Sequence, residues 1–207
     1  MTQYFTIHPV NPQTRLIRET TMILRQGGVI VYPTDSCYAL GCLIDSKLAI
    51  GRISRFRRLA PGHNMTLVCR DLSEIGVYAR VDNIAFRFIK RFTPGPYTFL
   101  LKATRDVPRR IQHPQKKTIG LRVPDNRIAL DILETLGEPM LSTSLIVPGN
   151  DLPESEPEEI NLKLKDQVDL IIDGGAGGLE ATSVIDLCGL TPRVVRHGKG
   201  DVSRIIE

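Results

Sequence analysis

Two spacings of apolar residues alternate along the chain. Short β-branched runs, such as VIVYP at 29–33 and TIGLRV at 118–123, are typical of buried strands. In the segments 12–26 and 126–136, apolar side chains recur every three or four residues, which predicts amphipathic helices. By the same criteria we expect further strands at 65–69, 97–103, 140–144, 168–173, 182–187 and 193–196, and further helices at 47–56, 71–76 and 82–92 and after the acidic loop 150–159.

Helix boundaries are marked by capping residues. We expect Asn11 to cap the first helix, Pro12 to occupy its first position and Gly27 to end it. Ser46 is the expected cap of the second helix. Helices and strands interleave along most of the chain, but the last strands follow each other too closely for helical crossovers. This predicts a single α/β domain over 1–207, with a twisted sheet of mixed parallel and antiparallel strands flanked by helices.

The composition is that of an ordinary globular protein, with 207 residues, 42% hydrophobic and 24% charged. The four cysteines have neither the spacing of a zinc site nor that of a disulfide framework, and they indicate a reducing compartment. The sequence shows no signal peptide and no apolar run long enough for a membrane helix. We therefore expect a cytoplasmic protein, monomeric or weakly dimeric.

Charge is unevenly distributed, although the net charge is only +4. Residues 47–122 contain seventeen Lys and Arg against four Asp and Glu. Such an excess repels itself unless an anionic partner or acidic segments of the chain compensate it. A solvated basic surface is the alternative for any single arginine. The block as a whole predicts a nucleotide or RNA as partner, with tRNA or double-stranded RNA as the candidates.

The first candidate site is the segment PTDSCYALG at 33–41, which follows a buried strand. It places the polar groups of Thr34, Asp35, Ser36 and Tyr38 at the strand's carboxyl edge, where ligands often bind. A turn closed by its own side-chain caps explains the same residues equally well. The segment alone does not decide between these readings.

Arginines and hydroxyls supply the other candidates. Arg52, Arg55, Arg57 and Arg58 lie at the end of the second helix, where they either complement the helix dipole or bind phosphates. The strand ending STS at 142–144 adds three hydroxyls. The glycine loop GGAGG at 174–178 matches no phosphate-binding motif, because a strand follows it, although it would allow close backbone approach to a ligand. No nucleophile elbow or paired-carboxylate arrangement is present.

In chain order, GGVIVYPTDSCYALG, the arginine-rich helix end leading to HNMTLVC, PGPYTFLLKAT, KKTIGLRVPDN, MLSTS, TSVIDL and RVVRHG resemble the motifs of the YrdC/YciO family, the threonylcarbamoyl-AMP synthase superfamily. The residues of these motifs resemble the YciO branch of the family most closely. The resemblance implies a YrdC-like fold around a central concave basic cavity. It also implies formation of an acyl-adenylate from threonine, bicarbonate and ATP, with Mg²⁺ accompanying the nucleotide, and a link to tRNA modification.

The resemblance also implies roles for individual residues. It assigns the amino-acid substrate to Thr34, Tyr38, Thr118 and Ser183, and the nucleotide to Asn64, Ser142, Ser144 and Arg196. Arg57 or Arg58 stands where a lysine contacts phosphate, so these two and Thr34 are the catalytic candidates. The basic block adds the RNA-binding candidates Arg52, Arg55, Arg109, Arg110, Lys116 and Lys117.

Two departures from the synthase motifs concern the nucleotide. The second basic residue of K-x-R is replaced by Leu59 or Ala60, and the amide of S-x-N is replaced by Ile146. Loss of one charge-assisted contact to a transition state commonly costs about 2 to 4 kcal/mol. We therefore expect either a nucleotidyltransferase with weak or altered activity, or a non-catalytic protein that holds RNA or a nucleotide in its basic cavity.

Overall fold

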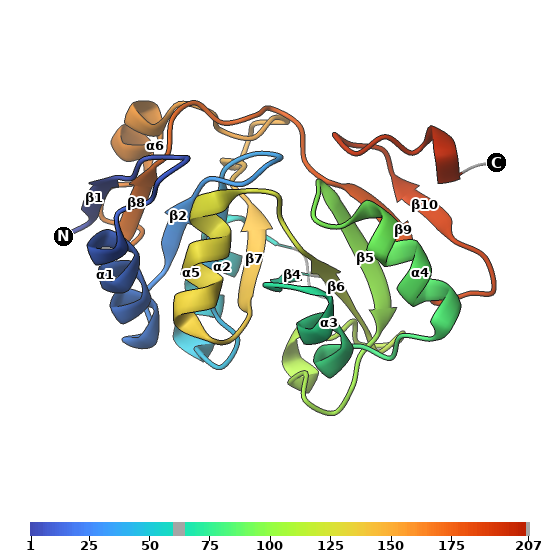
Figure 1. Cartoon of the computed structure of the whole chain (residues 1–207). Helices are drawn as coiled ribbons and strands as arrows, with labels where there is room; N and C mark the ends of the chain where they lie inside the picture. Colours follow the sequence, from blue (N-terminus) through green and yellow to red (C-terminus); the bar gives the residue numbers. More distant parts are fainter. Residues whose placement is uncertain (60–64, 206–207) are drawn as a thin grey trace.

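A computed structural model describes residues 1–59 and 65–205 and shows the predicted alternation of strands and helices (Figure 1). The strands are β1 (Gln3–Thr6), β2 (Ile30–Tyr32), β3 (Ala39–Leu43), β4 (Thr66–Val68), β5 (Tyr97–Lys102), β6 (Thr118–Arg122), β7 (Met140–Ser144), β8 (Leu170–Asp173), β9 (Ser183–Asp186) and β10 (Arg193–Arg196). The helices are α1 (Thr14–Arg25), α2 (Lys47–Phe56), α3 (Leu72–Tyr78), α4 (Asn83–Phe92), α5 (Arg127–Leu136) and α6 (Pro157–Leu164), with 3-10 turns η1 (Arg109–Ile111) and η2 (Ser203–Ile205).

The described strands form one mixed sheet in the order β1-β8-β2-β3-β7-β4-β6-β5-β9-β10. Four neighbouring pairs are parallel, namely β1 with β8, β8 with β2, β4 with β6 and β5 with β9, and the others are antiparallel. Strand direction turns strongly from one end of the sheet to the other (Figure 1). The predicted single α/β domain with a twisted mixed sheet is confirmed.

Side-chain caps begin four of the helices as the sequence indicates. The side chains of Ser46, Asp71, Asp82 and Asn126 accept hydrogen bonds from backbone N–H groups at the starts of α2, α3, α4 and α5. These bonds satisfy donors that have no partner within the helix. The first helix is the exception, because its N-cap is Gln13. Asn11 and Pro12 precede the helix in a turn, where the Nδ1 of His8 accepts the Asn11 N–H at 3.0 Å.

Two strands were not expected from the hydrophobic pattern. Strand β1 is a short edge strand that pairs only with β8, and its side chains do not alternate cleanly between buried and exposed. Strand β3 lies within the segment that we interpreted as a tight turn. Its sequence, ALGCL, is uniformly small or apolar because β3 is buried between β2 and β7. A Cβ on Gly41 would lie 2.9 Å from the Tyr32 ring, so this position requires a glycine.

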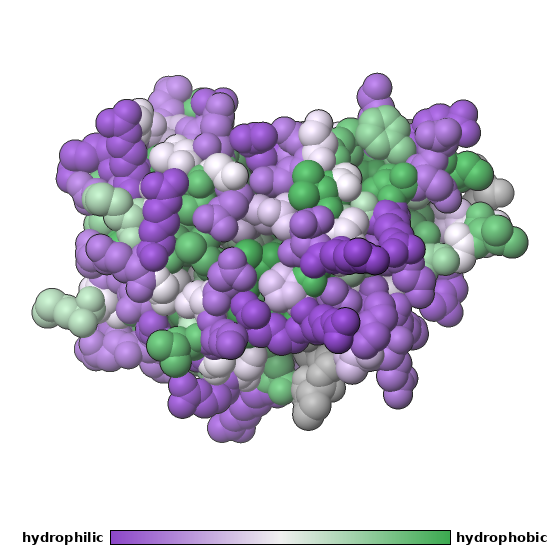
Figure 2. Space-filling view, turned by 90° about the horizontal axis from the view of Figure 1, so that it is seen from below, coloured by the Kyte–Doolittle hydropathy of each residue, from purple (hydrophilic) through white to green (hydrophobic). Residues whose placement is uncertain are grey.

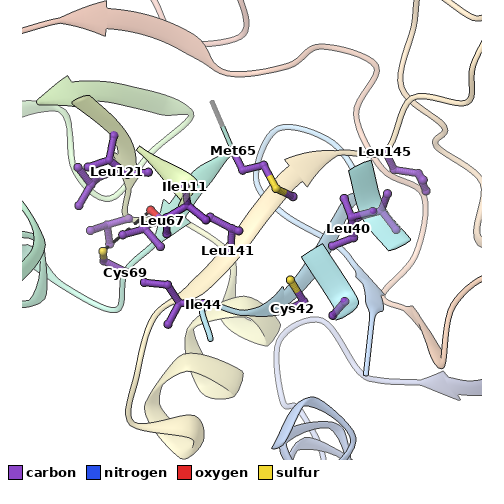
Figure 3. Packing of buried hydrophobic residues seen from close by; sticks show 14 of the residues in the cluster. Leu40, Cys42, Ile44, Met65, Leu67, Cys69, Ile111, Leu121, Leu141 and Leu145 are labelled. Carbon is purple, nitrogen blue, oxygen red and sulfur yellow. Dashed lines mark hydrogen bonds between the residues drawn. The ribbon is translucent and has the colours of Figure 1, made fainter. Parts of the chain in front are cut away.

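Helices cover the two faces of the sheet unequally. Apolar side chains of α2, α3, α4 and α6 pack on one face, in a cluster with residues such as Ile53, Ile75, Ile89 and Ile160. On this face Leu141, Leu67 and Leu121 lie side by side on the neighbouring strands β7, β4 and β6 (Figure 3). Among the described helices, α1 and α5 cover the other face, at the end of the sheet that carries β1, β8 and β2.

Polar residues occupy alternate positions on the strands of the middle of the sheet. In β7, β4 and β5 the apolar residues Leu141, Leu67 and Phe99 face the larger core, while their neighbours Ser142, Thr66 and Thr98 face the opposite side. This second side is the one that α1 and α5 leave uncovered. The sheet therefore presents a polar surface at its centre, and the candidate site lies on it.

The side of the molecule seen from below is mostly hydrophilic (Figure 2). The view from below shows polar side chains over most of that side, interrupted by small apolar patches (Figure 2). In the described part of the chain, no helix combines the length and the apolar character that crossing a bilayer requires.

Candidate active site

A cavity of about 220 Å³ opens on the polar face of the sheet. The turn after β2 and the strands β3, β4, β5, β6, β7, β9 and β10 or their flanking residues contribute to its walls. Its lining consists of Thr34, Ser36, Cys37, Ala39, Thr66, Val68, Thr98, Leu100, Gly120, Arg122, Ser142, Thr143, Ser144, Thr182, Val184 and Arg196. Half of these residues are serines or threonines, so the cavity offers many hydrogen-bond donors and acceptors and two guanidinium groups.

The turn after β2 is organised by Thr34. Its hydroxyl donates to the carbonyl of Cys37 at 2.6 Å and accepts the backbone N–H groups of Ser36 and Cys37 at 3.2 and 3.3 Å. The Ser36 hydroxyl lies 3.0 Å from that of Thr34. The self-capped turn is therefore present, and Thr34 both closes this turn and lines the cavity.

Arg122 is a cavity residue that the sequence analysis missed. Its guanidinium contacts the carboxylate of Asp35 and donates to the Ser36 hydroxyl at 3.2 Å. The Nε of Arg122 and the Oδ2 of Asp35 are buried without a hydrogen-bond partner within the described residues. The guanidinium group lines the polar cavity, and guanidinium groups are the side chains that best bind carboxylates and phosphates. Its sequence signal was a charged residue at a cavity-facing position of the otherwise apolar strand TIGLRV.

Ser142 is held by a hydrogen-bond chain across three neighbouring strands. The Tyr32 hydroxyl donates to the Ser142 hydroxyl at 2.8 Å, and Ser142 donates to the carbonyl of Leu40 at 3.0 Å. Burial raises the pKa of Tyr32 to about 12, so the phenol remains a neutral donor at physiological pH. These bonds hold the Ser142 hydroxyl in a fixed orientation in the cavity lining. Ser144, two residues further along β7, also lines the cavity.

Arg196 organises the opposite wall. It donates from Nη2 and Nε to the carbonyl of Thr182 at 2.8 and 3.1 Å, and from Nη2 to the Thr182 hydroxyl at 3.2 Å. The Thr182 hydroxyl lies 2.8 Å from that of Thr98 on the neighbouring strand. Burial lowers the pKa of Arg196, but a guanidinium remains charged at neutral pH.

Arg57 is half-buried, whereas Arg58 is exposed and has a left-handed backbone with φ 48°. The Nη1 of Arg57 donates to the carbonyl of Ile146, two residues after Ser144, and its Nε is buried without a partner in the described chain. Burial lowers its pKa. Neither arginine is among the residues that line the cavity, but Arg57 contacts the chain just beyond the lining residue Ser144. Asn64, expected at the nucleotide, falls outside the described residues.

Three other expected substrate residues do not line the cavity. Ser183 points away from it because strand neighbours face opposite sides, and Thr182 and Val184 take the cavity positions instead. The Tyr38 hydroxyl donates to the carbonyl of Gly175 at 2.7 Å and accepts the N–H of Gly174 at 3.1 Å, so Tyr38 holds the glycine loop. Thr118 is buried at the start of β6, two residues before Gly120.

The glycines of the loop 174–178 pack against the protein itself. A Cβ on Gly177 would lie 2.6 Å from the Tyr38 ring, and one on Gly178 would lie 2.1 Å from the carbonyl oxygen of Ser36. The absence of side chains therefore lets this loop cross the turn after β2. The sequence suggested that the backbone of this loop approaches a ligand closely, and in the structure it approaches Tyr38 and Ser36.

The six RNA candidates lie in two groups. Arg52 contacts Asp169 at 2.6 Å and donates to the carbonyl of Gln167, while Arg55 is exposed nearby on α2. Arg110 donates to the carbonyl of Ile44 at 2.8 Å and lies 3.6 Å from Asp45. The remaining three, Arg109, Lys116 and Lys117, are exposed in the loop between β5 and β6.

Within residues 1–59 and 65–205, no three His, Cys, Asp or Glu side chains converge as a metal-binding group. The thiols are free, and burial raises the pKa of Cys42 to about 12.

Comparison with known proteins agrees with this architecture. The family model Sua5_yciO_yrdC, described as "Telomere recombination", matches residues 22–198. The chain is 61% identical to YciO of Escherichia coli over 202 residues, which cover 98% of each protein, and the crystal structure of that YciO superposes with a TM-score of 0.96, at 60% identity, covering 99% of this chain and 100% of the other.

More distant relatives carry a named activity or ligand. The threonylcarbamoyl-AMP synthase of Chromobacterium violaceum is 35% identical over 137 residues, which cover 66% of this chain and 70% of the synthase. The crystal structure of Pyrococcus abyssi Sua5 complexed with L-threonine matches with a TM-score of 0.90 at 25% identity, covering 99% of this chain and 60% of the longer Sua5 chain. On the fold, the full-length match to YciO and the family model, this chain belongs to the Sua5/YciO/YrdC family.

Proposed function

We propose that the cavity binds ATP and a small hydroxylated amino acid, and that the protein forms threonylcarbamoyl-AMP or a closely related acyl-adenylate at a low rate. The observation that carries this proposal is Arg122, a buried guanidinium in the lining of a cavity that also carries eight serine and threonine residues. The relatives named as threonylcarbamoyl-AMP synthases and the Sua5 complex with L-threonine support the choice of ligand.

The cavity suits the two ends of an amino acid. The guanidinium of Arg122 is a donor for a carboxylate, and the hydroxyls of Thr34, Ser36 and Thr182 are partners for a side-chain hydroxyl or a carbamate. The nucleotide would occupy the side formed by Ser142, Ser144 and Arg196, as the family resemblance implies. Mg²⁺ would be held mainly by phosphate oxygens of the nucleotide.

The reaction needs positioning more than proton transfer. The amine of threonine and bicarbonate give a carbamate and water. A carbamate oxygen then attacks the α-phosphorus, the bond from that phosphorus to the bridging oxygen breaks, and pyrophosphate leaves. Because the nucleophile is already an anion, the side chains contribute alignment and positive charge near the phosphates. Arg57 and Arg196 supply that charge in this proposal.

A low rate is proposed because two nucleotide contacts are replaced by apolar side chains. Leu59 packs against the larger core, and Ile146 is half-buried beside the contact of its carbonyl with Arg57. Neither side chain offers a donor to a phosphate or an adenine.

Pyrophosphate release with ATP, threonine and bicarbonate tests the proposal, with the product identified by mass spectrometry against a panel of amino acids. We expect slow release that depends on all three substrates and is abolished by Arg122→Gln. The matched control is Arg127→Gln, which removes an exposed arginine of α5 that pairs with Asp131 at 2.9 Å. Release that is absent from the wild type, or equal in the two variants, would overturn the proposal.

A second proposal concerns RNA, and it rests on the loop between β5 and β6. In this loop and its flanks, Lys102 donates to the carbonyl of Lys116 at 3.0 Å, which brings both ends of the loop together. Exposed cations therefore cluster here, with Asp106 as the one carboxylate of the segment: Lys102, Arg105, Arg109, Lys116 and Lys117. Without tryptophan and with few aromatic residues, such a surface contacts phosphates rather than stacking on bases.

The double variant Arg109→Glu/Lys116→Glu tests this surface by fluorescence anisotropy with tRNA and with double-stranded RNA. Arg110 is left intact because it holds Ile44 and Asp45. We expect weaker RNA binding. The slope of log affinity against log salt concentration should become shallower by about 0.7 to 0.9 for each phosphate contact that is lost. The control is Arg18→Glu/Lys165→Glu, at exposed sites on α1 and after α6. Equal effects of the two double variants would contradict a defined RNA surface. If the protein retains RNA without catalysing release of pyrophosphate, it is a binding protein.

A further inference from the structure

The chain after β10 folds back toward the cavity as a hook, which we define as residues 197–201. Its backbone is attached at several points. The N–H of Lys199 donates to the carbonyl of Ala181 at 2.9 Å, and the N–H of Gly198 donates to the Ser183 hydroxyl at 3.0 Å. Ser183 in turn donates to the carbonyl of Gly200 at 2.6 Å. One fully buried serine therefore fastens two positions of the hook.

Two glycines let the hook lie this close to the sheet. A Cβ on Gly198 would lie 2.3 Å from the carbonyl oxygen of Ala181, and one on Gly200 would lie 2.4 Å from the Tyr97 ring. Any other residue would require the backbone to move at position 198, and the backbone or the Tyr97 ring to move at position 200. The sequence HGKGD thus sets Lys199 between two anchored glycines, with little freedom for its backbone.

The hook holds the Lys199 side chain over the turn after β2. The Nζ of Lys199 donates to the carbonyl oxygen of Asp35 at 2.5 Å, between the cavity residues Thr34 and Ser36. The Asp35 carboxylate is engaged by Arg122, and on this turn the Lys199 ammonium contacts a backbone carbonyl rather than a carboxylate. Lys199 is exposed, and an ammonium group has three donors, so it remains able to bind a further acceptor.

The size of the cavity indicates what that acceptor is. At about 220 Å³ it is smaller than the roughly 300–1,000 Å³ of sites that enclose drug-sized ligands. A ligand as large as a nucleoside triphosphate must therefore extend beyond the rim. The Nζ of Lys199 contacts Asp35, which lies between the lining residues Thr34 and Ser36 on the turn after β2, so its charge lies beside the cavity.

We propose that Lys199, positioned by the hook, binds the polyphosphate of the nucleotide where it leaves the cavity. This inference rests on the proposed binding of ATP and adds a residue that neither the sequence motifs nor the cavity lining includes. It makes Ser183 a positioning residue, which acts on the ligand through the hook.

Calorimetric titrations with ATP, adenosine and inorganic tripolyphosphate at fixed ionic strength test the inference. Lys199→Met should weaken the binding of ATP and tripolyphosphate about tenfold, because a charged hydrogen bond is lost. Adenosine, which has no phosphate, should bind as before, and Lys199→Arg should retain most of the affinity. The control Lys165→Met removes an exposed lysine after α6 and should change nothing.

Three results would overturn the role of Lys199: unchanged tripolyphosphate affinity in Lys199→Met, the same loss in Lys165→Met, or an equal loss for adenosine. A wild type that binds tripolyphosphate through Lys199 but fails to bind ATP would overturn the proposed function and leave the anion site in place. A wild type that binds neither ligand would overturn both.

Discussion

The guanidinium of Arg122 contacts the carboxylate of Asp35, and the two side chains are only 8% and 9% exposed. The contact joins the end of β6 to the turn after β2, which are 87 residues apart in the chain. It thereby fixes the position of the turn after β2 relative to β6, and both elements line the cavity. Because charges buried to this extent have lost most of their hydration, each depends on the other.

Asp35→Asn should therefore destabilise the fold by about 3 kcal/mol, since it leaves the Arg122 charge buried without its partner. Urea unfolding followed by circular dichroism measures the change. The control is Glu19→Gln in the exposed pair that Arg15 and Glu19 form at 2.7 Å on α1, where we expect less than about 1 kcal/mol. Similar losses in both variants would show that the Asp35 pair is solvated as a surface pair is.

Tyr32→Phe should cost about 1 kcal/mol at neutral pH, because the hydrogen bond to Ser142 is lost. Burial raises the pKa of Tyr32 in the folded protein to about 12, above its value in the unfolded chain. The unfolded chain therefore loses the phenol proton first, and the wild type loses stability as pH rises from about 10 to about 12, by at most about 1.4 kcal/mol per pH unit. The variant lacks this contribution, so the difference between the two proteins should diminish over that range. A difference in the free energy of unfolding between wild type and variant that stays constant from pH 9 to 12 would contradict this prediction.

Gly120→Ala should fill the floor of the cavity. The added Cβ would lie 3.1 Å from the Thr98 methyl group and 3.2 Å from the Thr66 hydroxyl. We expect ligand affinity to fall by about tenfold, with a change in stability below about 1 kcal/mol. Binding of threonine and ATP is measured by calorimetry. Gly51→Ala is the control, because no atom lies within 4 Å of its added Cβ on α2. Unchanged binding in Gly120→Ala would place the ligand elsewhere.

Thr182→Val and Ser183→Ala should separate two neighbouring residues with different roles. Thr182 faces the cavity, so removal of its hydroxyl should weaken amino-acid binding severalfold with little effect on tripolyphosphate. Ser183 fastens the hook, so its substitution should weaken tripolyphosphate binding and lower stability by about 1 to 2 kcal/mol. Weaker amino-acid binding in Ser183→Ala, with tripolyphosphate binding weakened in Thr182→Val instead, would indicate that Ser183 contacts the substrate and does not act through the hook.

Leu59→Arg together with Ile146→Asn should raise pyrophosphate release by about tenfold or more, because each change adds a donor where the nucleotide is proposed to bind. Ala60, the alternative position for the added arginine, falls outside the described residues. Leu162→Arg, which adds the same charge at an exposed position of α6, is the control for net charge. A folded double variant with unchanged release would mean that the cavity is shaped for a different reaction.

The sequence alone located the segments of the site but not all of its side chains. The runs at 33–41 and 142–144, each chosen because it lies at the end of a strand, both contribute to one cavity. Ser183 was chosen over Thr182 because motif position does not reveal which side of a strand faces a ligand. A shift of one residue in a strand reverses the facing side. The alternation in β9, with Ile185 in the core, carries the signal that identifies Thr182.

Arg122 and Lys199 required the structure for different reasons. Arg122 stands inside an apolar strand pattern, where a charge is itself unusual and could have been noticed. Lys199 has no signal in the sequence, because its place depends on a hook that returns across residues 164 positions earlier in the chain. The strand β1 was missed since four residues without clear alternation carry too little pattern, and its partner β8 lies far along the chain.

The pairing of β1 with β8 has a consequence for how the protein is made. Strand β1 has its partner at Leu170–Asp173, and β8 is also a neighbour of β2. Strand β1 therefore stays unpaired until residue 173 has been synthesised, whereas β2 can already pair with β3 and waits only for its second neighbour. The sheet is therefore completed late in translation, and until then the free edge of β2 is open to pairing with another chain.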